Sequence, residues 1–310
     1  MISSDLHEAV RLLSAGKLVG MPTETVYGLA ANALDPVAVA RIFEAKNRPA
    51  FDPLIVHIGQ RAELAQLVTQ LPAEAEALMQ AFWPGPLTLV LPKTEAVPDL
   101  VTSGLPHVAV RMPRHPLALR LLQSLPFPLA APSANPFGYV SPTTAQHVMD
   151  QLADQVGFVL DGGPCQVGLE STVVGFRSDR AIILRQGGIP QEAIEEVLGH
   201  AVDSQTSQSR PDAPGQLDSH YAPHRTIHLL EHGTRPTDVA KESWISFAPH
   251  AEAMASLAPD GSVATAAQRL FGVLRHLDQQ PGGPVWIEKA PEIGLGRAVN
   301  DRLMRAAHRA

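Results

Sequence analysis

The feature that most constrains the fold of this 310-residue chain is a series of short apolar runs, each about the length of one β-strand. The runs are LIVHI (54–58), LTLVL (87–91), VAVR (108–111), FVLD (158–161), STVVGF (171–176) and AIILR (181–185). Segments that fit helices stand among them, over residues 6–13, 36–45, 61–70, 73–82, 114–124 and 142–153. This irregular mixture predicts an α/β or α+β domain with a sizeable, partly parallel sheet.

The composition changes near residue 200, which predicts a division into domains. Residues 203–224 are polar, contain Ser and Pro, and lack apolar periodicity, so we expect a linker there. Residues 1–202 would form the main domain. Residues 225–310 contain the runs TIHLL, SWISF and VWIEKA together with two helical segments, and predict a smaller Rossmann-like α/β domain.

Charge and cysteine content exclude some classes of protein. The chain has 24 Lys and Arg against 31 Asp and Glu, a formal charge of -7, so it does not bind nucleic acid by bulk electrostatic attraction. Its single cysteine, Cys165, excludes an intramolecular disulfide. The N-terminus lacks the apolar core of a signal peptide, and no run approaches the roughly 20 apolar residues of a membrane span. We expect a cytoplasmic protein without a membrane partner.

Polar clusters at the ends of the predicted strands are the candidate functional site. The phosphate loop GxxxxGK[ST] and the motifs GxGxxG, HExxH and GxSxG do not occur, so the common signatures give no assignment. Ligands of α/β sheets gather in loops at strand ends. The clusters are PTETVYGLAANA (22–33), KNRP (46–49), RMPRHP (111–116), APSANPFGYVSPTT (131–144), GLESTVVGF (168–176) and ILRQGGI (183–189).

These clusters supply the side chains that bind anions. Cations for a polyanionic ligand would be Lys46, Arg48, Arg111 and Arg185, and hydrogen-bond donors to phosphate or carboxylate oxygens would be Ser133, Asn135, Ser141 and Ser171.

Each residue also has a structural interpretation. Lys46 and Arg48 stand where cations stabilise a helix C-terminus, His57 fits a buried core histidine, and Ser141 fits a helix N-cap. Spacing alone leaves the functional and structural interpretations open.

Taken together, the segments resemble one family. PTETVYGLAANA, KNRPAFDPLIVHI, FWPGPLTLVL, VAVRMP, PLAAPSAN and GLESTVV are similar to the YrdC-like threonylcarbamoyl-AMP synthases. APGQLDSHYAP (213–223) and GLGRAVNDRLMRAA (294–307) resemble the two-domain form of that family. The resemblance covers nearly the whole chain in a consistent order. It implies a twisted mixed sheet with flanking helices around a concave, positively lined cavity.

The resemblance also implies an activity. The family consists of nucleotidyltransferases that make L-threonylcarbamoyl-AMP and diphosphate from L-threonine, bicarbonate and ATP, usually with Mg2+. The product serves the N6-threonylcarbamoyladenosine modification of tRNA, so the downstream tRNA threonylcarbamoyl transferase machinery is the expected partner. Two alternatives remain. A non-catalytic RNA-binding module could use the basic tail at 297–309 for a transient tRNA contact. Carbamoyl transfer in hydrogenase maturation is expected with zinc fingers, which one cysteine cannot supply.

Residue roles follow from the resemblance, motif by motif. Lys46 and Arg48 with Ser133 and Asn135 match the family's KxR and SxN elements, which line the nucleotide site. The residues implied for threonine are Thr25, His57, Arg111, Ala131 and Ser171. Those implied for ATP are Arg48, Asp52, His107, Ser133, Ser141, Arg185 and Tyr221. No protein metal site is implied. Tyr221 implies that residues 213–223 fold over the cavity as a lid. Asp52 and His107 depart from the pattern, which has Asn and a small hydroxyl residue there.

Overall fold

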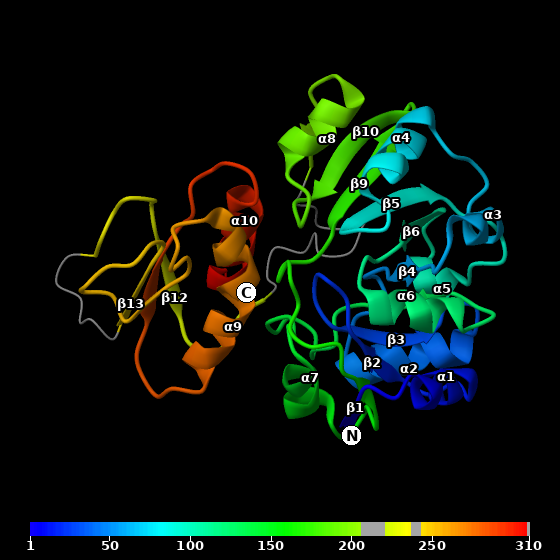
Figure 1. The fold of residues 1–310 in the computed structure, drawn as a ribbon, viewed down its shortest axis with the longest axis horizontal. Coiled ribbons are helices and arrows are strands. Elements are labelled where there is room, and N and C mark those ends of the chain that lie inside the picture. Colours follow the sequence, from blue (N-terminus) through cyan, green and yellow to red (C-terminus); the bar gives the residue numbers. More distant parts are fainter. Residues whose placement is uncertain (206–220, 237–242, 309–310) are drawn as a thin grey trace.

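The computed structural model of the chain describes residues 1–205, 221–236 and 243–308. Most of the predicted linker and most of the predicted lid fall at 206–220 and lie outside these residues. The described residues form an eleven-stranded mixed sheet with helices, followed by a separate four-stranded sheet (Figure 1). The predicted α/β class with a larger mixed sheet and a smaller α/β unit is confirmed. No helix of the described part of the chain is long and apolar enough to cross a bilayer.

The larger sheet has the strand order β1-β8-β2-β3-β7-β4-β6-β5-β9-β10-β11 and contains parallel and antiparallel pairs. Its strands are β1 (Ile2–Ser3), β2 (Val19–Met21), β3 (Gly28–Asn32), β4 (Ile55–His57), β5 (Leu87–Pro92), β6 (His107–Arg111), β7 (Leu129–Ala130), β8 (Val159–Leu160), β9 (Thr172–Arg177), β10 (Arg180–Arg185) and β11 (Asp203–Ser204). Its helices are α1 (Leu6–Ser14), α2 (Pro36–Lys46), the 3-10 turn η1 (Arg61–Glu63), α3 (Leu64–Leu67), α4 (Ala73–Phe82), α5 (Asp99–Thr102), α6 (Pro116–Gln123), α7 (Ala145–Leu152) and α8 (Gln191–Leu198).

Strand alternation places the functional side chains on one face of this sheet. In β4 and β6, Val56 and Val110 point into the main apolar core, while Ile55 belongs to a smaller cluster on the opposite face. Because successive side chains of a strand point to opposite faces, His57 and Arg111 share the face of Ile55. The two residues are register partners across the parallel pair. The sheet therefore presents a histidine and an arginine side by side.

A local irregularity places Arg185 on that same face. Strict alternation would put Arg185 with Ile183, which is buried in the main core. The register between β10 and β9 shifts between these two residues, as at a β-bulge. A bulge changes the direction of the side chains that follow it. It accounts for Arg185 lying with the pocket residues rather than in the core.

Helix α2 shows how the sequence delivers the KNRP cluster. Asp35 caps the helix by accepting from the backbone N–H of Val37, and Pro36 occupies the first turn, as predicted. The helix ends at Asn47, which takes the left-handed conformation with φ of 51°. That turn separates Lys46, in the last helical turn, from Arg48 in the following loop.

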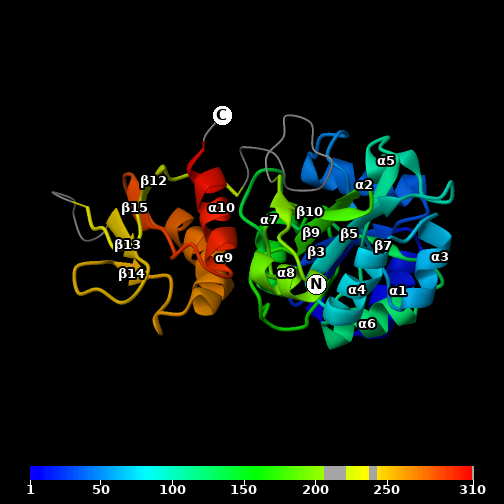
Figure 2. The ribbon, with the colours of Figure 1, turned by 90° about the horizontal axis from the view of Figure 1, so that it is seen from above.

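The smaller sheet is wholly parallel, with the order β12-β15-β13-β14. Its elements are β12 (Ile227–Leu230), β13 (Trp244–Ser246), β14 (Ala255–Ser256), α9 (Val263–Asp278), β15 (Val285–Glu288) and α10 (Gly296–Ala307). Figures 1 and 2 place α9 and α10 between this sheet and the larger unit. These elements, β12 to α10, are called the C-terminal unit, and the two helices form the surface by which it meets the rest of the described chain.

Some local predictions are wrong for identifiable reasons. The helix expected over 61–70 ends at Leu67, because Val68 forms an isolated bridge with Lys93. The helix expected from residue 142 begins at Ala145 and is capped by Thr144 instead of Ser141. Strand β3 is not among the predicted strands. Its residues, GLAAN, are small and have little β propensity, so pairing with β2 and β7 decides its structure.

The backbone at Gly187 packs closely against the backbone at Glu170 and Ser171. A Cβ added at Gly187 would lie 2.4 Å from the carbonyl carbon of Ser171 and 2.5 Å from the carbonyl oxygen of Glu170. We expect Gly187→Ala to lower the free energy of unfolding by about 1–3 kcal/mol, since backbone must shift. Gly157→Ala is the control, because its Cβ would meet nothing within 4 Å. Equal urea midpoints for the two variants would contradict this packing.

Candidate active site

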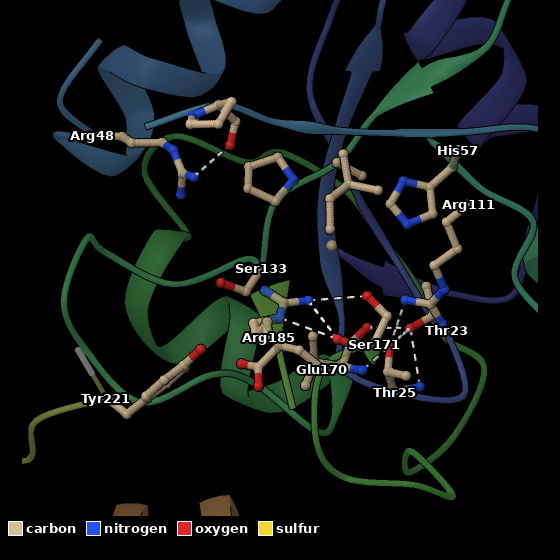
Figure 3. Close-up of a pocket in the computed structure, with 16 residues that line it drawn as sticks. Thr23, Thr25, Arg48, His57, Arg111, Ser133, Glu170, Ser171, Arg185 and Tyr221 are labelled. Atoms are coloured by element: carbon tan, nitrogen blue, oxygen red, sulfur yellow. Dashed lines mark hydrogen bonds between the residues drawn. The ribbon is translucent and has the colours of Figure 1, made fainter. Parts of the chain in front are cut away.

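A pocket lies over the face of the larger sheet that carries His57 and Arg111. It encloses about 580 Å³, open solvent at the mouth included. Figure 3 shows His57, Arg111 and Thr25 at one side of it and Arg48 and Tyr221 at the other. Its lining residues are Thr23, Thr25, Val26, Gly28, Arg48, Pro53, Ile55, His57, Arg111, Ala131, Pro132, Ser133, Glu170, Ser171, Arg185 and Tyr221.

Arg111 is held at the first side by three hydrogen bonds. Its Nη1 donates to Thr25 Oγ1 at 2.8 Å, its Nη2 to Glu24 Oε1 at 2.7 Å, and its Nε to the carbonyl oxygen of Gly85 at 3.3 Å. A guanidinium has five N–H donors, so N–H groups remain for a ligand. The contacts fix the plane of the group, which suits it to bind a carboxylate through two parallel hydrogen bonds.

Glu24 is the buried carboxylate that pairs with Arg111, and its motif did not predict this role. Its side chain is almost fully buried, and its Oε2 accepts from the backbone N–H of Arg114 at 3.1 Å. Burial alone would raise the pKa of Glu24, but the attraction of Arg111 brings the pKa below its ordinary value. The carboxylate is therefore ionised at neutral pH and keeps Arg111 in place.

His57 lies beside Arg111 as a neutral polar group. Burial, and then the positive charge of Arg111, lower the pKa of His57 to about 3. Its Nδ1 is buried and has no hydrogen-bond partner within the described residues. A neutral imidazole in this position can donate a hydrogen bond to a ligand in the pocket or accept one from it.

Arg48 lines the other side of the pocket and is paired within its own loop. Its Nη2 lies 2.8 Å from Asp52 Oδ2 and 2.9 Å from the carbonyl oxygen of Pro53. Burial raises the pKa of Asp52, and the nearby Arg48 opposes that shift. Asp52 itself does not line the pocket. Its carboxylate is thus paired with Arg48.

Lys46 and Asn135 organise the loop around Ser133 and do not line the pocket. The Nζ of Lys46 is buried and donates to the carbonyl oxygens of Ser133, at 2.5 Å, and Asn135. The amide of Asn135 donates to the carbonyl oxygens of Pro136 and Tyr139. Burial, together with Arg48, lowers the pKa of Lys46 well below its ordinary value. The KxR and SxN elements therefore meet, but mostly through backbone contacts.

Two further buried side chains, those of Arg185 and Glu170, line the pocket. Arg185 donates from Nη2 to the carbonyl oxygen and the Oγ of Ser171, at 2.9 and 3.0 Å. The Oγ of Ser171 also lies 2.7 Å from Thr88 Oγ1. Glu170 accepts from Ser141 Oγ at 2.6 Å. Ser141 therefore lies behind Glu170 rather than in the lining of the pocket.

Tyr221 reaches the pocket from the C-terminal side of the chain. Its ring is buried and stacks on Phe271 of α9, with 5.4 Å between the ring centroids. The guanidinium of Arg302 lies 5.2 Å from the centroid of the same ring. Burial raises the pKa of Tyr221 to about 12, so its hydroxyl is protonated at neutral pH.

The pocket thus gathers most of the residues expected from the sequence. Thr25, Arg48, His57, Arg111, Ala131, Ser133, Ser171, Arg185 and Tyr221 line it. Lys46, Asp52, His107, Asn135 and Ser141 do not. His107 is exposed at the opposite end of β6 from Arg111, about 13 Å along the strand. Glu24 and Glu170 went unassigned, although each stands next to an assigned residue in PTET and GLEST.

Comparisons with known families cover most of the chain. Residues 11–187 match a family described as "Telomere recombination", and residues 189–308 match the "Threonylcarbamoyl-AMP synthase, C-terminal domain". The threonylcarbamoyl-AMP synthase of Pyrococcus abyssi is 43% identical over 96% of this chain and 93% of its own length. That of Bacillus subtilis is 41% identical over 97% of this chain and 92% of its own length.

Solved structures agree with these matches. The crystal structure of P. abyssi Sua5 complexed with L-threonine superposes with a TM-score of 0.91 at 40% identity, covering 99% of this chain and 97% of that one. Full-length HypF in a phosphate- and nucleotide-bound form is 22% identical, with a TM-score of 0.53 over 59% of this chain and 29% of that one. The similarity to HypF concerns the fold alone.

The depressed pKa of His57 predicts an acid-sensitive stability. The pKa is about 3 in the folded state against an ordinary 6.5, so only the unfolded state gains this proton as the pH falls below 6.5. The wild type then loses about 1.4 kcal/mol of stability per pH unit from this group, or about 2 kcal/mol at pH 5. We expect His57→Gln to lack this loss in urea unfolding at pH 7.5 and pH 5.

The control for this experiment is His7→Gln, at an exposed position on α1, which should keep the pH dependence of the wild type. An identical pH dependence in the wild type and in His57→Gln would show that His57 titrates alike in both states.

Proposed function

The chain belongs to the family of two-domain threonylcarbamoyl-AMP synthases, and we propose that the pocket described above binds L-threonine at the side of Arg111 and ATP at the side of Arg48. The activity is that of a nucleotidyltransferase serving threonylcarbamoyladenosine formation in tRNA. The single observation that carries the proposal is the pairing of His57 and Arg111 across one strand pair, in a pocket whose other side carries a further arginine.

At the threonine side, each polar group of the substrate has a candidate partner. The carboxylate would bind the N–H groups of Arg111 that point away from Glu24. Thr25, His57, Ser171 and the backbone at Ala131 line the space around it. Because His57 is neutral, it can hydrogen-bond the substrate without adding a charge next to Arg111. This arrangement favours a small amino acid with a free carboxylate.

At the ATP side, cations face the place where phosphate charge would lie. Arg48 and Arg185 both line the pocket, with Ser133 between the two sides (Figure 3). Tyr221 would cover the nucleotide from the C-terminal side, and the lid role of 213–223 stays a prediction because most of that segment lies outside the described residues. Nucleotide contacts of Lys46, Asp52, Asn135, Ser141 and His107 likewise stay predictions, for which the lining of the pocket gives no support.

The proposed reaction has two bond-forming steps. The threonine amine attacks CO2, derived from bicarbonate, and loses a proton to give a carbamate. A carbamate oxygen then attacks the α-phosphorus of ATP, the bond from that phosphorus to the bridging oxygen breaks, and diphosphate leaves. Arg48 and Arg185 would stabilise the charge that spreads over the phosphate oxygens. Burial of the site would exclude water from the labile mixed anhydride.

Mg2+ is expected to arrive with ATP rather than to occupy a protein site. Both oxygens of Glu170, the carboxylate that lines the pocket, already accept hydrogen bonds, from Ser141 and Arg302. The described residues contain no group of three or more His, Cys, Asp or Glu side chains placed to hold a metal. Mg2+ commonly binds through substrate phosphates and water, and it would reduce the charge on the triphosphate.

The alternative functions are less well supported. A basic tail that binds RNA would need exposed cations, but Arg302 and Arg305 are buried and Arg297 pairs with Glu192. Arg309 lies outside the described residues. The likeness to HypF, at 22% identity, concerns the fold alone. We propose that the product passes to the downstream tRNA threonylcarbamoyl transferase machinery, and that any tRNA contact is transient.

The activity itself gives the first test of this proposal. The purified protein should release diphosphate from ATP only when L-threonine and bicarbonate are both present, because the carbamate is the nucleophile. A coupled diphosphate assay, with each component omitted in turn, measures this requirement. Diphosphate release that does not depend on threonine would contradict the proposed reaction.

Arg111→Ala tests the threonine side. We expect the threonine KM to rise by about 10- to 100-fold with a smaller change in the ATP KM, because a charged hydrogen bond is worth roughly 1.5–3 kcal/mol. Arg114→Ala is the matched control, since its exposed side chain is three residues away and its contact to Glu24 uses the backbone.

Arg111→Ala also leaves Glu24 buried without its partner. The double variant Arg111→Ala, Glu24→Gln removes that charge and carries the test if the single variant does not fold. An unchanged threonine KM in either folded variant would assign Arg111 a structural role only.

A further inference from the structure

Arg302 of α10 is a fully buried cation that makes contacts far from its own helix. Its Nε donates to Glu170 Oε2 at 2.9 Å, and its Nη2 donates to the carbonyl oxygen of Gln186 at 2.8 Å. Its Nη1 donates to Asp301 Oδ2 at 2.5 Å. Glu170 lines the pocket, and Gln186 directly follows the lining residue Arg185. One side chain of the C-terminal unit therefore reaches the wall of the pocket.

The same guanidinium also packs against Tyr221. Its carbon lies 5.2 Å from the ring centroid, within the range of a cation–π contact. The ring also stacks on Phe271 of α9, so Tyr221 contacts both helices of the C-terminal unit. Figure 3 shows Tyr221 and Glu170 close together at the lower side of the pocket. Arg302 thus contacts two lining residues.

Stability alone does not explain a charge in this position. Moving a guanidinium into the interior is unfavourable by several kcal/mol unless its partners are well placed, and an apolar residue of similar size often serves stability as well. Neighbours on the same helix, Val299 and Leu303, follow that apolar pattern and are fully buried in the core of the C-terminal unit. Arg302 departs from that pattern, as do its buried neighbours Asp301 and Arg305. Of these pairs, only Arg302–Glu170 joins the helix to a pocket carboxylate.

The negative charge of Glu170 explains why a buried cation stands at position 302. Burial would raise its pKa, but Arg302 and Arg185 bring the pKa below its ordinary value, so the group is an anion. Its second oxygen accepts from Ser141 Oγ at 2.6 Å. An anion in the wall of the pocket would repel the phosphates of ATP unless a cation behind it compensates. Arg302 is that cation.

We propose that Arg302 is a positioning residue for the reaction. It compensates the charge of Glu170 at the wall of the pocket, and through this ion pair it makes the C-terminal unit part of the ATP site. This inference rests on the proposed function, which places ATP at the side of Arg48, Arg185 and Tyr221. A second contact supports it, because Arg275 of α9 donates to the carbonyl oxygens of Val140 and Ser141, next to Glu170.

The experiment compares Arg302→Met with the double variant Arg302→Met, Glu170→Gln in steady-state diphosphate release. Arg302→Met removes the cation and keeps a long side chain, so the ATP KM should rise by about ten-fold or more, with a smaller effect on the threonine KM. Glu170→Gln then removes the uncompensated anion, and the double variant should return to within about three-fold of the wild-type ATP KM.

Arg297→Met is the matched control. Arg297 lies on the same helix and pairs with Glu192 of the larger unit at 2.6 Å, but that pair is partly exposed and remote from the pocket lining. This variant should keep the wild-type KM for both substrates. A role of Arg302 in packing alone would lower the melting temperature and the active fraction, hence kcat, and leave the ATP KM unchanged.

The outcomes distinguish a failure of the proposed function from a failure of the proposed role of Arg302. An inactive wild type would overturn the proposed function, whereas an active wild type together with an unchanged ATP KM in Arg302→Met would overturn only this inference. If Arg302→Met does not fold, the double variant decides. A folded double variant with a near wild-type ATP KM supports the inference, and an unfolded one, or one with a raised ATP KM, overturns it.

Discussion

Buried pairs of arginine and carboxylate are the interaction on which the pocket depends. Each of three such pairs holds one part of it, and the distances between nitrogen and oxygen are 2.7–2.9 Å. The pairs are Arg111–Glu24, Arg48–Asp52 and Arg302–Glu170. Loss of one partner from a buried pair leaves an uncompensated charge and is unfavourable by about 3–5 kcal/mol. The pairs therefore fix the arginines before any ligand arrives.

This arrangement reconciles a positive pocket with an acidic protein. The chain carries a formal charge of -7, yet Arg48, Arg111 and Arg185 meet in one pocket. Each keeps its orientation through hydrogen bonds to carboxylates or backbone carbonyls. Groups held in this way need little reorganisation when phosphate charge develops, which is the basis of electrostatic catalysis. The C-terminal unit takes part because the partner of Glu170 lies on α10.

The sequence predicts the apolar strands β4 to β6 and β8 to β10, the α/β class and most of the pocket, because strand alternation and the family motifs are local signals. Strict alternation places His57 and Arg111 on one face, and the motifs group them with Ser171. The contacts that the sequence does not reveal are long-range. Arg302 lies 132 positions from Glu170, and its helix reads as an amphipathic basic tail when taken alone.

Local rules also mislead where tertiary contacts override them. Ser141 stands before Pro142 in a pattern typical of a helix start, yet its hydroxyl is bonded to Glu170 and the helix begins at Ala145. Asp52 stands where the family pattern has Asn, and Arg48 compensates its charge in the fold. Ser141 thus has a distant partner that spacing could not indicate, whereas the partner of Asp52 lies four positions away in the same loop.

A crystal structure of the protein with L-threonine and a non-hydrolysable ATP analogue tests the central claim most directly. The account predicts the threonine carboxylate on Arg111, the phosphates within hydrogen-bond distance of Arg48 or Arg185, and an intact ion pair between Arg302 and Glu170. A nucleotide bound outside this pocket, or threonine bound without contact to Arg111, would contradict it.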